Sequence, residues 1–170
     1  KRMSFRIPFK CFDEQILEDT PEFTLKLDED GWQRKYYKTR DLVQEIKPVI
    51  VEEEDWPLLK ERIESELEHY CSDEKLREIY GKYTDGHRNG EFSIRFRASG
   101  FFWTARELLG VEEHLIAFYE MPELLHEIND FILEKYLEYF DKIFSLIQPE
   151  VILFEEDLSG VNGPMISPEM

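Results

Sequence analysis

The chain has 170 residues, of which 42% are apolar and 14% aromatic, enough for a hydrophobic core and too many for a disordered protein. Its 38 acidic and 21 basic residues give a net charge of −17, which argues against nucleic acid or an anionic membrane surface as a partner. The two cysteines are too few for a disulfide framework or a zinc cluster, and no apolar run reaches membrane-spanning length. No signal-peptide pattern is present, so we expect a cytoplasmic protein with reduced thiols.

The first part of the chain predicts extended structure. The segment "FTLKL" (23–27) alternates apolar and polar residues, and Gly31 in "DEDG" can adopt the positive φ of a hairpin turn. We therefore expect residues 1–52 to form an N-terminal β-hairpin extension and residues 53–170 to form the main domain.

The main domain is expected to begin with two helices and a strand. In "EDWPLLKERIESELEHY" the apolar residues recur at helical spacing, and Ser72 can cap a second, shorter helix that ends near Gly81. The Gly, Asp and Asn content of "GKYTDGHRNG" indicates a loop. The segment "EFSIRFRASG" then alternates strictly, with Phe96 and other apolar residues on one face and Arg95 and Arg97 on the other.

Helices and a second strand complete the pattern. "FWTARELLG" and "VEEHLIAFYE" predict helices, and Pro122 opens the longest helix, which carries a wide apolar stripe. The continuous apolar run "VILF" (151–154) predicts a strand that is buried on both faces. The final "ISPEM" is typical of the first turn of a further helix. This order favours βα units and a parallel sheet.

Charged residues follow or occupy both predicted strands, and ligands of βα folds bind at the carboxyl ends of strands. Arg95 and Arg97 could form an anion site, or they could face water on an edge strand. Glu155, Glu156 and Asp157 could supply a general acid or a cation ligand, or they could solvate a loop and cap a helix. None of the four histidines has the spacing of a metal pair, so we expect them to be structural.

The stretch from "RASGFFWTARELLG" to "EEDLSGVNGPMISPEM" resembles the uroporphyrinogen decarboxylase superfamily, which includes the porphyrin decarboxylases of haem synthesis and corrinoid-linked methyltransferases. The likeness covers roughly residues 90–170 and lies in the "SGFFWTA" turn, the "PELL" helix start, and the acidic strand end before "SPE". The resemblance implies an α/β fold, namely an incomplete (β/α)8 TIM-type barrel with the N-terminal β-hairpin extension. The chain would then be the front part of a longer enzyme.

The resemblance also implies a site and a chemistry. Asp157, with Glu156, would be catalytic at the barrel mouth, where the substrate is a small acid or a methylated molecule. Arg95 and Arg97 are included in the site only because strand alternation places them on the polar face; no family motif supports them. The residues expected to contact the substrate are Arg95, Arg97, Gly100 and Trp103.

The arginine-rich "RQAGRY" motif of the haem-pathway lyases is absent, which favours methyl transfer with zinc and a corrinoid (cobalamin) protein as partner. The zinc ligands of such methyltransferases would lie after the last residue, so we assign no metal ligand within the chain and expect no turnover from it alone. The alternative function is a noncatalytic acidic module that binds other proteins or self-associates as a homodimer through unpaired strand edges.

Overall fold

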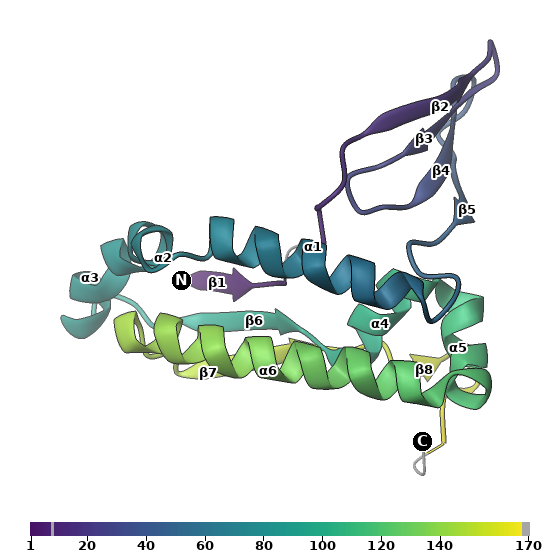
Figure 1. The fold of residues 1–170 in the computed structure, drawn as a ribbon. Coiled ribbons are helices and arrows are strands. Elements are labelled where there is room, and N and C mark those ends of the chain that lie inside the picture. Colours follow the sequence, from purple (N-terminus) through teal and green to yellow (C-terminus); the bar gives the residue numbers. More distant parts are fainter. Residues whose placement is uncertain (8, 168–170) are drawn as a thin grey trace.

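The computed structural model describes residues 1–7 and 9–167 (Figure 1). Its strands are β1 (Arg2–Phe5), β2 (Gln15–Asp19), β3 (Phe23–Leu27), β4 (Gln33–Tyr37), β5 (Val43–Lys47), β6 (Arg95–Ser99), β7 (Val151–Glu155), β8 (Ser159–Gly160) and β9 (Gly163–Pro164). Its helices are α1 (Asp55–Tyr70), α2 (Asp73–Tyr80), the 3₁₀ helix η1 (Gly81–Tyr83), α3 (Thr84–Arg88), α4 (Phe101–Leu109), α5 (Val111–Glu120) and α6 (Pro122–Leu146). A parallel sheet packed on helices forms the body, and an antiparallel sheet projects from it (Figure 1).

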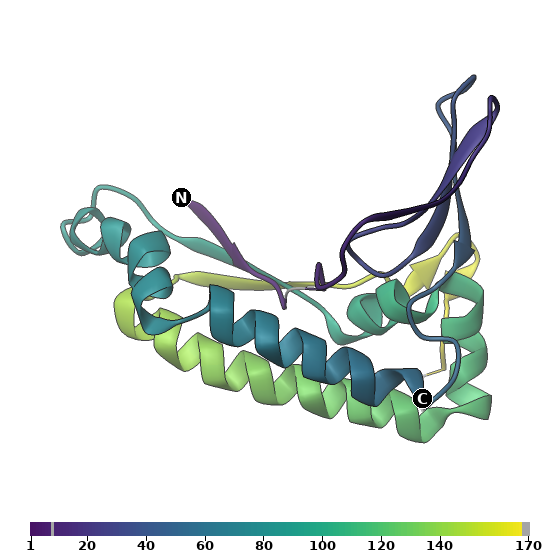
Figure 2. The same ribbon diagram turned by 45° about the horizontal axis from the view of Figure 1, so that its top comes forward.

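The parallel sheet has the strand order β1-β6-β7, and α1 and α6 lie side by side against one of its faces (Figure 2). The alternation of β6 explains this arrangement. Phe96 and Ala98 are buried on the helix side, whereas Arg95 and Arg97 are exposed on the opposite side, which we call the open face. The predicted strand and its two faces are confirmed.

The longest helix, α6, begins at Pro122 as predicted, where the missing N–H of proline costs the helix no hydrogen bond. Its buried residues recur every three or four positions and form one stripe along the core side of the helix. These residues are Leu124, Leu125, Ile128, Phe131, Ile132, Tyr136, Tyr139 and Ile143.

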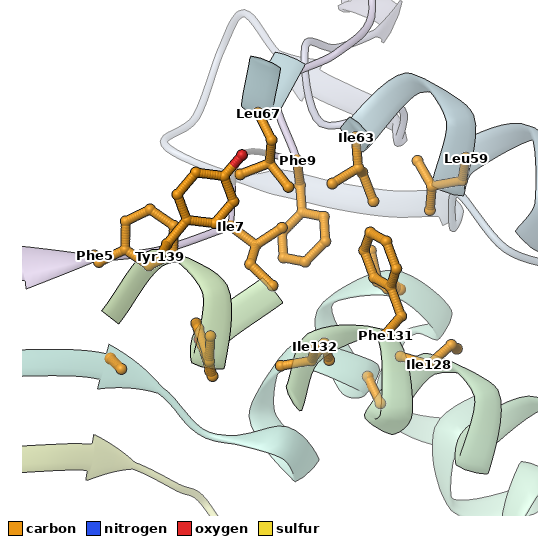
Figure 3. Packing of buried hydrophobic residues seen from close by; sticks show 14 of the residues in the cluster. Phe5, Ile7, Phe9, Leu59, Ile63, Leu67, Ile128, Phe131, Ile132 and Tyr139 are labelled. Carbon is orange, nitrogen blue, oxygen red and sulfur yellow. The ribbon is translucent and has the colours of Figure 1, made fainter. Parts of the chain in front are cut away.

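Side chains from the end of β1 and from residues that follow it pack in the core against α1 and α6 (Figure 3). Phe5, Ile7 and Phe9 are buried there, and full burial of each such side chain contributes about 1.5–3 kcal/mol. The labelled partners from the two helices are Leu59, Ile63, Leu67, Ile128, Phe131, Ile132 and Tyr139.

The antiparallel sheet, β2-β3-β4-β5, stands away from the body, and we call it the arm (Figure 1). The predicted hairpin is thus two of four strands, and its turn contains Gly31 at a φ of 84°. Trp32 anchors the arm, because its indole is buried and its Nε1 donates a hydrogen bond of 2.9 Å to the carbonyl oxygen of Glu107 on α4.

The segment 81–90 is not the loop that its composition predicts, because it contains η1 and α3. Tertiary contacts hold these short helices in place. The hydroxyl of Thr84 donates to the carbonyl oxygen of Leu146 at 2.9 Å, and His87 Nε2 lies 2.9 Å from a carboxylate oxygen of Glu150. Composition could not reveal either partner, since each is more than 60 residues away.

The prediction that 151–154 is buried on both faces is wrong. Val151, Ile152 and Phe154 are 51%, 44% and 44% exposed. Val151 is in register with Arg95 and therefore lies on the open face, which the helices of the body do not cover. Ile152 and Phe154 lie on the helix side, but β7 is an edge strand, so no neighbouring strand shields its outer side in the described residues. The predicted helix start at "ISPEM" falls largely on residues 168–170, outside the described residues.

The prediction of an incomplete (β/α)8 barrel is also wrong. The described residues form an open sheet of three parallel strands with helices on one face, and two separate antiparallel sheets. For the main domain, the sequence predicts only two strands with helices between them. This pattern is found both in small open sheets and in closed barrels, so it could not distinguish the two folds. The expected boundary at residue 52 also separates β1 from β6, with which it pairs in parallel.

Candidate functional site

A hollow of about 660 Å³ lies on the open face and extends to the carboxyl ends of the three parallel strands. We call it the substrate hollow, after the role that we propose for it under Proposed function. Each strand contributes to it, because parallel strands end at the same edge of a sheet. Its charged and aromatic lining consists of Arg2, Phe5, Arg6, Arg97, Trp103, Glu107, Glu155 and Glu156.

Arg97 and Glu155 form the ion pair in the floor of the hollow. Arg97 points to the open face because it alternates with the buried Phe96 and Ala98 on β6. Glu155 is the last residue of β7 and lies in register with Ser99, two residues after that arginine on β6. Both side chains are close to half exposed, so an incoming ligand can reach them.

Glu156 caps the N-terminus of α4. Its two carboxylate oxygens accept hydrogen bonds from the backbone N–H groups of Phe102, at 3.2 Å, and Trp103, at 2.9 Å. A negative charge is favourable there because the first N–H groups of a helix have no intrahelical partner. Gly100 makes this cap possible, since a Cβ at that position would lie 2.0 Å from Glu156 Cδ.

Asp157 has a different partner. Its carboxylate forms an ion pair with the guanidinium of Arg106 on α4, and that guanidinium lies 4.7 Å from the centre of the Trp103 ring. Asp157 therefore helps to fix the aromatic wall of the hollow through Arg106.

The ion pair between Arg6 and Glu107 forms another wall of the hollow. Sequence reasoning missed both residues, and it missed Arg106. A signal for two of them existed, because Trp103, Arg106 and Glu107 are three and four positions apart and share one face of α4. No such signal existed for Arg6, whose place depends on the pairing of β1 with β6.

The structure brings together some of the predicted site residues. Arg97, Trp103 and Glu156 line the substrate hollow. Arg95 is exposed on the open face, and Gly100 is buried next to Glu156. Of the two expected catalytic carboxylates, Glu156 caps the N-terminus of α4, and Asp157 forms an ion pair with Arg106.

A buried histidine lies behind this site. His114 on α5 is 1% exposed, and its Nδ1 has no hydrogen-bond partner. Its ring centre lies 4.6 Å from that of Phe102 and 5.3 Å from that of Phe118. Burial, and to a smaller extent the charge of Arg106, lowers the pKa of His114 from 6.5 to about 4.

We expect His114 to make the protein less stable as the pH falls. The unfolded chain gains a proton at this residue near pH 6.5, whereas the folded chain does so only near pH 4, so stability is lost between these values. The loss reaches up to about 3 kcal/mol, from ~1.4 kcal/mol for each pKa unit. Urea unfolding at several pH values should therefore show a flatter profile for His114→Gln than for the wild type. Parallel profiles would contradict this prediction.

In the described part of the chain, no three His, Cys, Asp or Glu side chains come together as a metal site. We therefore assign zinc and the corrinoid no ligands here and derive no step through them. Residues 1–7 and 9–167 also contain no helix that is long and apolar enough to cross a membrane.

Comparison with known proteins gives no relative for this chain. No family model, no curated protein and no solved structure matches it. The resemblance to the uroporphyrinogen decarboxylase superfamily thus stays a prediction that depends on the quoted motifs.

Proposed function

We propose that the protein binds a small carboxylate-bearing molecule in the substrate hollow and serves an enzymatic reaction on it. The observation that supports this most is the position of Arg6 and Arg97 in a hollow that extends to the carboxyl ends of three parallel strands. A planar guanidinium donates two parallel hydrogen bonds to a carboxylate, which suits it to small acids.

The ion pair between Arg97 and Glu155 suggests how the substrate carboxylate would bind. A substrate carboxylate would replace Glu155 as the partner of Arg97, and it would gain two charge-assisted hydrogen bonds. Glu155, released at the edge of the hollow, would then be free to accept or donate a proton. Trp103, fixed by Arg106, would provide an aromatic wall for the apolar part of the substrate.

The choice of reaction follows from the family resemblance. We propose methyl transfer ahead of decarboxylation, because the arginine motif of the haem-pathway lyases is absent from the sequence. Methyl transfer would draw its zinc and its corrinoid partner from outside the described residues.

Replacing Arg97 is expected to weaken acid binding at least tenfold without unfolding the protein. Benzoate is a suitable probe, since it combines a carboxylate with a ring that can stack on Trp103. In Arg97→Gln we expect the affinity for benzoate to fall at least tenfold, which corresponds to the loss of about 1.4 kcal/mol or more from a charge-assisted hydrogen bond. The melting temperature should change by no more than a few degrees, because half-exposed ion pairs contribute about 0–1 kcal/mol.

The measurement is a titration of ¹⁵N-labelled protein followed by amide chemical shifts. Arg88→Gln is the matched control, since Arg88 is an exposed arginine on α3 whose ion-pair partner, Asp85, is 3.7 Å away. Wild type and Arg88→Gln should bind equally, with shifts concentrated from Arg97 to Trp103. Equal affinity in Arg97→Gln, or shifts elsewhere only, would refute the proposed function.

A further inference from the structure

Two arginines lie directly opposite each other on the open face. Arg2 of β1 and Arg95 of β6 are register partners in a parallel pair, so both side chains leave the sheet on the same side. Neighbouring strands are only about 4.8 Å apart. In the part of the chain that the structure describes, neither guanidinium has a carboxylate partner, whereas Arg97 is paired with Glu155.

This pair is unexpected for two physical reasons. Like charges on directly opposite residues of a sheet destabilise it. The chain also carries 38 acidic residues, so carboxylates that could neutralise an arginine are abundant. The two adjacent positive charges on the open face are therefore available to an anion from solution.

We propose that Arg2 and Arg95 form a binding position for a doubly charged oxyanion, such as the phosphate or sulfate group of a ligand. Two adjacent guanidinium groups can each neutralise one of its charges and donate hydrogen bonds to different oxygens. Ser4, which is in register with Arg97 and exposed on the same face, adds a hydroxyl donor two residues after Arg2 on β1. A single carboxylate would leave one of the two arginine charges uncompensated.

Arg2 also lines the substrate hollow and Arg95 does not, so the oxyanion position adjoins one end of that hollow, and the carboxyl ends of the strands lie at the other. Arg95 and Arg97 are separated by about 6.6 Å along β6. A ligand that fills both positions is a small acid that also carries a phosphate or sulfate group. This last step rests on the proposed function, whereas the oxyanion position itself does not.

The test uses inorganic phosphate alone, at pH 7.5 and at ionic strength held constant with sodium chloride. If the dissociation constant is about 1 mM, 10 mM phosphate should raise the melting temperature of the wild type by about 3–6 °C. In Arg95→Gln this shift should fall below about 1 °C. The melting temperature without phosphate should be unchanged or higher, because the repulsion between the two arginines is removed.

Arg88→Gln again serves as the control and should keep the full shift. Sulfate should act like phosphate, and acetate should have at most a small effect. A phosphate shift no larger than that of chloride, or a full shift retained in Arg95→Gln, would overturn the proposal. Failure of benzoate binding together with a phosphate shift that depends on Arg95 would remove the proposed function and leave the oxyanion position in place.

Discussion

Gly100→Ala is expected to destabilise the protein by about 2–4 kcal/mol, the sum of an overpacked contact and a lost helix cap. The new Cβ would lie 2.0 Å from Cδ and 2.1 Å from Oε1 of Glu156, which carries the cap of α4. The carboxylate would have to move away, and the N–H groups of Phe102 and Trp103 would lose their acceptor. Urea unfolding gives the change in the free energy of unfolding.

A double-mutant cycle shows whether this mechanism is correct. Glu156→Ala alone removes the cap and should cost about 1 kcal/mol. The double variant Gly100→Ala/Glu156→Ala should cost about the same as Glu156→Ala alone, because the three atoms nearest to the new Cβ all belong to Glu156. Gly81→Ala is the matched control, since its Cβ would meet only Arg77 Cβ, at 3.9 Å, and the change should be neutral or slightly stabilising. Additive losses in the cycle would mean that Gly100 is needed for another reason.

The elements that the sequence predicts correctly are those with a strong local signal. Apolar residues at helical spacing indicate α6, with Pro122 at its first turn, and strict alternation indicates β6. Both patterns involve neighbouring residues only, so no knowledge of the rest of the fold is needed. The arm was recognised only as one hairpin, because β2 and β5 lie at its edges and their exposed residues alternate weakly.

The errors concern properties that depend on distant partners. An apolar run such as "VILF" indicates a strand but not whether a neighbour covers it, and β7 is an exposed edge. The same limit applies to the site. Arg97 and Trp103 were found from alternation and from a motif, whereas Arg6 and Glu107 meet across 101 residues of chain. The oxyanion pair likewise depends on the register of Arg2 with Arg95, which no local pattern specifies.

Phe96→Ala is expected to destabilise the protein by about 3–5 kcal/mol, the usual cost of removing a fully buried phenylalanine. Phe96 is 0% exposed, and its ring packs edge-to-face on Phe140 and Phe144, with centroids 5.6 and 5.1 Å away. These contacts join the middle strand of the parallel sheet to α6. Thermal and urea unfolding should both show the loss, at about 2–4 °C of melting temperature for each kcal/mol.

Phe154→Ala is the control for Phe96→Ala, and it also tests whether the edge strand β7 is exposed in solution. Phe154 lies on the neighbouring strand and the same side of the sheet, but it is 44% exposed and its nearest aromatic rings, Tyr136 and Phe140, lie 6.1 and 6.2 Å away. Its truncation should therefore cost about 1 kcal/mol, and the loss should not depend on protein concentration. A loss as large as that of Phe96→Ala would contradict the exposed edge. If that loss also varied with protein concentration, it would mean that a second copy covers β7 in solution, since only an association between chains depends on concentration.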